Sequence, residues 1–139
     1  MNPGLDEPGP IELMVPTTGA NAAIVRIVAA ALAAHLDYGV DRIDDLRLVT
    51  GESFSLLMEL CQPADSLPLR IAISDGGTAP SIHLHSEGVT RSAEPPSNSD
   101  LRWTLITALA NDVRLHVHDG RFTFDIHVAA HPPLPRPDD

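Results

Sequence analysis

Two short segments of alternating apolar residues follow each other in the middle of the chain, and they restrict the fold more than any other feature. Leu69–Ser74 is apolar at every second position, and Ser81–His85 alternates again after the turn Asp75-Gly76-Gly77. Alternation predicts half-buried β-strands, and a short glycine-containing connection predicts an antiparallel hairpin. A doubly wound parallel sheet needs strict alternation of strands and helices, so these segments argue against it.

The other patterns complete an α+β order of elements. Further strands are expected at Ile11–Val15, Leu115–His118 and Phe122–Ala129, the last two joined by the turn Asp119-Gly120. Helices are expected at Ala20–Leu36, Arg42–Leu60 and Leu101–Val113. The sequence therefore predicts a two-layer α/β sandwich with a mixed, mostly antiparallel sheet and three helices on one face.

Details of the three helices can also be predicted. Asp41 is expected to cap the second helix, and Ser97 or Ser99 the third. The second half of Arg42–Leu60 is apolar on most sides and must be covered on more than one face. The apolar stripes of the first and third helices are expected at Ala23, Ile24, Ile27, Val28, Ala31 and Leu32, and at Leu101, Leu105, Leu109 and Val113.

Length and proline content predict one domain between two tails. The chain has 139 residues, which suits a single core. Residues 1–10 are expected to form a flexible tail and residues 131–139 a proline-rich acidic tail, because dense prolines prevent regular hydrogen bonding. Residues 11–130 are then the domain.

Charge and cysteine content exclude several classes of function. The net charge is −10, so binding to duplex DNA or to an anionic membrane surface is not expected. The single cysteine excludes an internal disulfide and a cysteine-rich zinc site. No signal peptide is evident at the start, and we expect a cytoplasmic protein.

Two segments carry a resemblance to a known family. Leu46–Leu56, which contains Thr50-Gly51-Glu52, resembles the second-helix motif of the RsbW-type anti-sigma factors, serine kinases of the histidine-kinase-like (GHKL) ATPase fold. Trp103–Val113 followed by His118-Asp119-Gly120 resembles the last helix and hairpin of that family, most like its diverged mycobacterial-type members. The resemblance runs from about Ile11 to Ala129 and implies the same fold.

The resemblance also assigns the positions of a catalytic site. In the family, the second helix supplies a glutamate that acts as base and, four residues later, an asparagine that holds Mg²⁺. Glu52 and Leu56 occupy these positions here, and leucine has no lone pair for a hard cation. Ser55 and Glu59 are expected on other faces of the helix. Glu52 is therefore either a vestigial catalytic residue or a polar residue on the solvent side.

The other two nucleotide-binding devices are a turn and a glycine-rich loop. Asp75 and Gly77 match the family's Asp-x-Gly motif, whose aspartate accepts a hydrogen bond from the adenine amino group, although a plain hairpin turn explains the same residues. Glu94–Asp100 contains no glycine and two prolines, so it lacks the N–H groups of a phosphate cradle. We expect no cofactor, with ATP binding in the absence of Mg²⁺ left open.

Two further features are candidate binding sites. Arg26 is the only formally charged residue between Ala20 and Leu36, and by the resemblance it lies on the surface that meets the sigma factor or its antagonist; the alternative is a solvated charge. The pairs His83/His85 and His116/His118 each share a strand face and could hold zinc, but few acidic residues stand nearby in the sequence. Surface histidines explain the pairs more simply, and no metal site is expected.

These observations leave three hypotheses for function. The first is an anti-sigma factor, a partner-switching regulator that inhibits a sigma factor and releases it to an antagonist. The second is an active ATP-dependent serine kinase that phosphorylates the antagonist. The third is a diverged dimerisation or sensing domain. By the resemblance we expect a homodimer.

Overall fold

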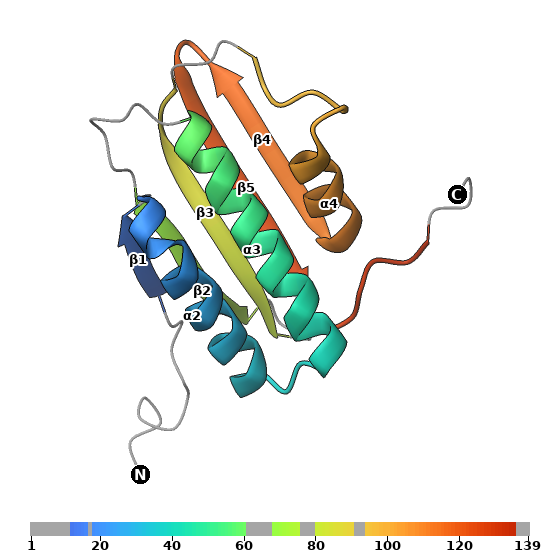
Figure 1. Cartoon of the computed structure of the whole chain (residues 1–139). Helices are drawn as coiled ribbons and strands as arrows, with labels where there is room; N and C mark the ends of the chain where they lie inside the picture. The colour runs from blue at the N-terminus through green and yellow to red at the C-terminus, as the bar shows by residue number, and fades with distance from the viewer. Residues whose placement is uncertain (1–11, 17, 61–67, 76–79, 91–93, 136–139) are drawn as a thin grey trace.

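The computed structural model describes residues 12–16, 18–60, 68–75, 80–90 and 94–135, and Figure 1 shows their arrangement. In chain order the elements are β1 (Glu12–Pro16), the short 3-10 helix η1 (Gly19–Asn21), α2 (Ala22–His35), α3 (Val40–Leu60), β2 (Pro68–Asp75), β3 (Pro80–Val89), α4 (Leu101–Leu109), β4 (Asp112–His118) and β5 (Arg121–Ala129). The predicted order of strands and helices is confirmed. No helix among these residues is long and apolar enough to cross a membrane.

The five strands form one sheet in the order β1-β2-β3-β5-β4, and every neighbouring pair described is antiparallel. The expectation of a mixed sheet is therefore corrected. β3 and β4 run in the same direction and are connected through α4, as in a parallel βαβ unit, but β5 inserts between them and pairs with both. Insertion of the last strand separates β3 from β4, so these two strands do not pair with each other.

The helices α2, α3 and α4 all cover the same face of the sheet, which confirms the predicted two-layer α+β architecture (Figure 1). Strict alternation along β5 produces this arrangement. Its even-numbered residues are buried beneath the helices, whereas the odd-numbered ones face the other side of the sheet and are partly exposed. The core combines these side chains with the apolar inner face of α3, including Leu46, Phe54 and Leu57.

The buried face of α2 differs from the predicted stripe. Ile24 is 50% exposed and Ile27 is 66% exposed, while the core contacts come from Val25, Ala29, Ala30, Leu32 and Ala33. α2 is apolar nearly all round, so the sequence does not indicate which side is inward. Small alanines face the core and leave two large isoleucines on the outside.

The ends of α3 and α4 also differ from expectation. α3 begins at Val40, and Asp41 lies in its first turn rather than at the cap. Asp100 caps α4, because its carboxylate accepts a hydrogen bond from the Arg102 backbone N–H at 3.0 Å; neither Ser97 nor Ser99 does so. α4 ends at Leu109, and the predicted last helical residue, Val113, belongs to β4.

The end of α4 is fixed by contacts with the sheet and with α3. The backbone of Ala110 is extended, and the N–H of Asn111 pairs with the carbonyl of His127. Arg42, which is only 4% exposed, donates hydrogen bonds to the carbonyls of Leu109 at 2.7 Å and Ala129 at 2.8 Å. These bonds join the start of α3 to the ends of α4 and β5, and so they set the position of α3 over the sheet.

Candidate functional site

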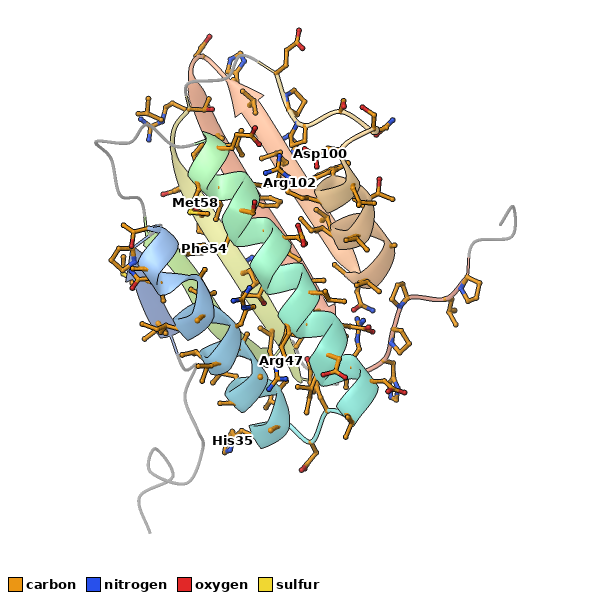
Figure 2. The ribbon with its side chains drawn as sticks, viewed as in Figure 1. His35, Arg47, Phe54, Met58, Asp100 and Arg102 are labelled. Carbon is orange, nitrogen blue, oxygen red and sulfur yellow. The ribbon has the colours of Figure 1, made fainter. Side chains whose placement is uncertain are left out.

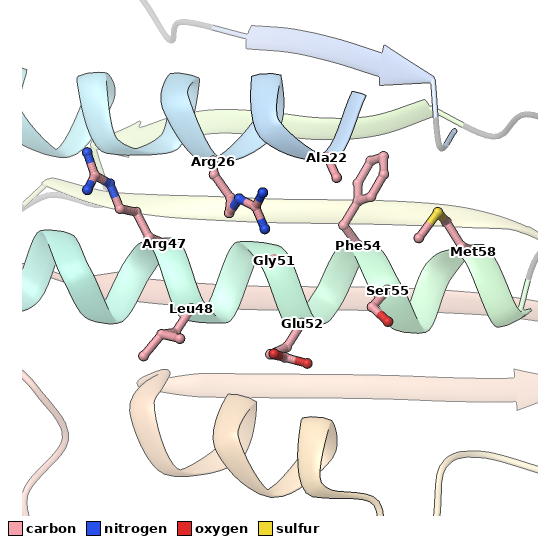
Figure 3. Close-up of a pocket in the computed structure, with 9 residues that line it drawn as sticks. All are labelled: Ala22, Arg26, Arg47, Leu48, Gly51, Glu52, Phe54, Ser55 and Met58. Carbon is pink, nitrogen blue, oxygen red and sulfur yellow. The ribbon is translucent and has the colours of Figure 1, made fainter. Parts of the chain in front are cut away.

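Glu52 lies on the outer side of α3, where it is partly buried and lines a surface pocket of about 400 Å³ between α2 and α3. In Figure 3, Leu48, Glu52 and Ser55 point toward α4, while Arg26 and Arg47 lie on the α2 side. Ser55 is thus on the same side of α3 as Glu52, contrary to the expectation from sequence. This follows from helical geometry, because residues three and four apart are neighbours on a helix surface.

Leu56 lies one helical turn after Glu52 but is 1% exposed. It contacts a different pocket, of about 280 Å³, between the end of α3 and the segment before α4. The other residues that line this pocket are Glu59, Leu60, Glu94, Pro95, Pro96 and Asp100. Carboxylates and proline rings surround the position where the resemblance would put phosphates. Leu56 itself offers no ligand for Mg²⁺, the two prolines have no N–H to donate to an anion, and the carboxylates would repel phosphate.

Arg102 closes the gap between α3 and α4 (Figure 2). Its guanidinium donates to the Asp100 carboxylate at 2.8 Å, to Ser55 Oγ at 3.2 Å, and to Glu59. The hydrogen bond from Arg102 lowers the pKa of Asp100, and the bonds to Asp100 and Glu59 raise the pKa of Arg102. Arg102 is therefore engaged by protein carboxylates.

Sequence reasoning missed this ion-pair cluster. It also placed Glu59 on another face of α3, whereas Glu59 and Ser55 both reach Arg102 across the α3–α4 junction. The available signal was the spacing Asp100-x-Arg102 at a helix start, which is typical of an N-cap followed by a side chain that can return to it.

The predicted adenine-binding motif, Asp75 and Gly77, lies only partly within the described residues. Asp75 is the last residue of β2 and is in register with Pro80 of β3. Gly77 lies outside the described residues. Adenine binding by Asp75 and Gly77 therefore stays a prediction.

Arg26 is exposed on α2 and lies over Gly51 of α3 (Figure 3). A Cβ added to Gly51 would be 3.3 Å from Arg26 Cδ, so the glycine leaves room for this side chain to cross α3. Within the described part of the chain, Arg26 forms no ion pair. Arg47, in the same pocket, is exposed and reaches Asp44 only at 4.0 Å.

Two large apolar side chains, Leu48 and Met58, are exposed on α3 and line the same pocket as these two arginines. Glu52 adds one carboxylate to the lining. We call the surface formed by Arg26, Arg47, Leu48, Glu52 and Met58 the α2/α3 face. Two arginines beside exposed apolar side chains are a local departure from the net charge of −10 of the whole chain. Exposed apolar side chains gathered near charges are typical of a protein-binding surface.

The structure separates the two histidine pairs. His83 and His85 lie on β3 and His116 and His118 on β4, with β5 between these strands. The pairs therefore do not form one four-histidine site. Instead, His83 and His85 both contact Asp125 of β5, a residue that sequence reasoning did not connect with them.

Comparison with known structures gives evidence about the fold. The structure is similar to the crystal structure of the RsbU and RsbW domains of Rv1364c from Mycobacterium tuberculosis, with a TM-score of 0.63 and 14% sequence identity. The match covers 91% of this chain and 34% of that chain. No protein-family model matches the sequence, and no curated protein matches it. The likeness supports an RsbW-like, histidine-kinase-like ATPase fold and does not assign the chain to a particular member of the family.

Proposed function

We propose that this protein is an anti-sigma factor that binds its protein partners through the α2/α3 face and does not use Mg·ATP. The observation that carries the proposal is the α2/α3 face itself, where two arginines and two large exposed apolar side chains line one pocket on a chain that is acidic as a whole. The RsbW-like fold supports a partner-switching role. The partners proposed are a sigma factor and a competing antagonist.

The surroundings of Leu56 favour a binding protein over the kinase alternative. A buried leucine at the metal-binding position offers nothing to replace the waters of Mg²⁺, which dehydrates reluctantly. Phosphoryl transfer depends mainly on positioning and charge neutralisation, so loss of the metal site removes the main catalytic device. Glu59 and Asp100, held by Arg102, add negative charge near the place of the phosphates.

The test begins with capture of a partner and continues with the purified pair. The protein should capture a sigma factor from an extract of the source cells, and it should inhibit transcription by RNA polymerase carrying that sigma factor. Arg26→Glu should weaken the binary complex by about 2 kcal/mol, or roughly 30-fold, because an interfacial charge contact is lost and reversed.

Arg121→Glu is a matched control. Arg121 is also exposed, but it lies on the sheet face opposite the helices, so the same charge reversal should leave the affinity unchanged. Gly51→Ala displaces the Arg26 side chain without changing its charge and should have an intermediate effect. Equal affinity of wild type and Arg26→Glu would remove the α2/α3 face from the proposal. Transcription that is not inhibited would refute the anti-sigma role.

A further inference from the structure

The sheet face away from the helices carries a compact group of histidines and one aspartate. His83 and His85 project from β3, and the register places them opposite His127 and Asp125 of β5. Both strands lie inside the sheet, with a neighbouring strand on each side, so ladder hydrogen bonds hold their backbones from both sides. Side chains on such a frame are positioned more narrowly than side chains on loops.

The side chains of His83 and His85 converge on one atom. His83 Nε2 lies 2.8 Å from Asp125 Oδ1, and His85 Nδ1 lies 2.6 Å from the same oxygen. One donor atom from each of the three residues can be chosen so that all lie within 4.8 Å of one another. The three side chains are 27%, 23% and 26% exposed, so they are shielded from bulk water but accessible from one side.

Neighbouring residues fix the orientation of both rings. The Glu87 carboxylate lies 3.6 Å from His85 Nε2, on the side of the ring opposite Asp125. The His127 ring stacks on His83 with a centroid distance of 4.1 Å and an interplanar angle of 8°. A carboxylate beside the second nitrogen of a histidine and a fixed ring plane are both features that orient metal ligands.

The charged groups that face the three donors favour a cation. Besides Asp125 itself, the Glu87 carboxylate lies beside His85. The nearest cation on β4, Arg114, is paired with Asp112 at 3.2 Å.

We propose that His83 Nε2, His85 Nδ1 and Asp125 Oδ1 form a binding site for Zn²⁺, with water as the fourth ligand on the exposed side. Two imidazoles and one carboxylate are a common donor set for zinc, and nitrogen donors disfavour Mg²⁺ and Ca²⁺. Tetrahedral Zn²⁺ with bonds of about 2.0–2.2 Å separates its ligands by about 3.3–3.5 Å. Coordination therefore needs small side-chain rotations and the transfer of each ligating nitrogen's proton to the other nitrogen of the same ring or to solvent.

The experiment uses the full-length, untagged, metal-free chain and measures Zn²⁺ binding by calorimetry. Wild type should bind one Zn²⁺ per chain and should not respond to Mg²⁺. His83→Ala, His85→Ala and Asp125→Asn should each weaken zinc binding more than the roughly 10–100-fold that is typical when residues that orient the ligands are changed. Glu87→Gln should fall within that smaller range.

His116→Ala is the matched control, because His116 lies exposed on the same sheet face but outside the cluster. Its zinc affinity should equal that of wild type. Circular dichroism should be used to check that each variant folds. Asp125→Asn keeps the side-chain volume, so it still tests the site if a histidine variant does not fold. Co²⁺ should give the visible absorption of a tetrahedral site in wild type and lose it in Asp125→Asn. Equal affinities across wild type and the ligand variants, or the absence of binding in wild type, would show that the cluster is only a hydrogen-bond network.

Discussion

Replacement of Arg42 should destabilise the protein more than any surface change, because this arginine joins three elements from a buried position. Its guanidinium donates to the carbonyls of Leu109 and Ala129 and to Asn111 Oδ1, and it pairs with Asp45 at 3.2 Å. Asn111 Oδ1 also accepts the backbone N–H of Ala129 at 2.8 Å. Arg42→Ala removes every donor of the arginine side chain and opens a cavity at the start of α3.

The magnitude follows from these contacts. Hydrogen bonds to a charged group contribute about 1.5–3 kcal/mol each, but they are not additive, and water can reach some of the released acceptors. Breaking a buried charged pair costs about 3–5 kcal/mol, and we expect Arg42→Ala to lose an amount in that range. Since small domains have a total stability of about 5–15 kcal/mol, the variant should be folded but marginal.

Urea unfolding provides the measurement. The single tryptophan, Trp103, packs against Phe124 with ring centroids 6.3 Å apart, so its fluorescence reports on the junction of α4 and the sheet. Arg42→Lys should be intermediate, because an ammonium cannot serve all the acceptors at once. Arg47→Ala is the control, and it should change stability by less than about 0.5 kcal/mol because its ion pair is exposed. A loss below about 1 kcal/mol for Arg42→Ala would refute the argument that this network positions α3.

Three further predictions concern nucleotide, assembly and pH. Calorimetry should detect no Mg²⁺-dependent ATP binding, and Leu56→Asn should create it only if the site is a vestige of an ATP site; micromolar Mg·ATP affinity in wild type would instead support the kinase. Sedimentation should show a homodimer, and a monomer at high concentration would contradict this. Asp100→Asn should destabilise the protein at pH 7. Asparagine still caps a helix, so only the charge is tested. The folded-state pKa of Asp100 is lowered, so its contribution is present above the unfolded pKa and is lost as the pH falls through the folded pKa. A difference in unfolding free energy that persists in acid would assign the effect to something other than this charge.

The sequence predicted the architecture well where periodicity was unambiguous. Alternation in Phe122–Ala129 and in the two central hairpin segments predicted strands, and these segments are β5, β2 and β3 in the structure. Periodicity did not show which side of α2 faces the core, because alanines and isoleucines make that helix apolar on nearly every side. The outward position of Ile24 and Ile27 depends on packing against α3, which local pattern does not encode.

The candidate sites show the same limit. His83 and His85 could be paired from their spacing alone, but their contact with Asp125 depends on strand register across 40 residues of sequence. The cluster of Asp100, Arg102 and Glu59 likewise depends on how α4 packs beside α3. By contrast, the absence of a metal-ligating side chain at position 56 can be read directly from the sequence, because leucine has no donor atom in any packing.

Without phosphoryl transfer, a partner-switching protein would select between its two partners by binding alone. A kinase can modify its antagonist covalently. A protein that only binds is instead distributed between its two partners according to their concentrations and relative affinities. A tenfold preference corresponds to about 1.4 kcal/mol, which one charged contact at an interface can supply. If both partners use the α2/α3 face, Arg26 is a residue that can set this preference. Regulation would then depend on the supply of the antagonist rather than on ATP.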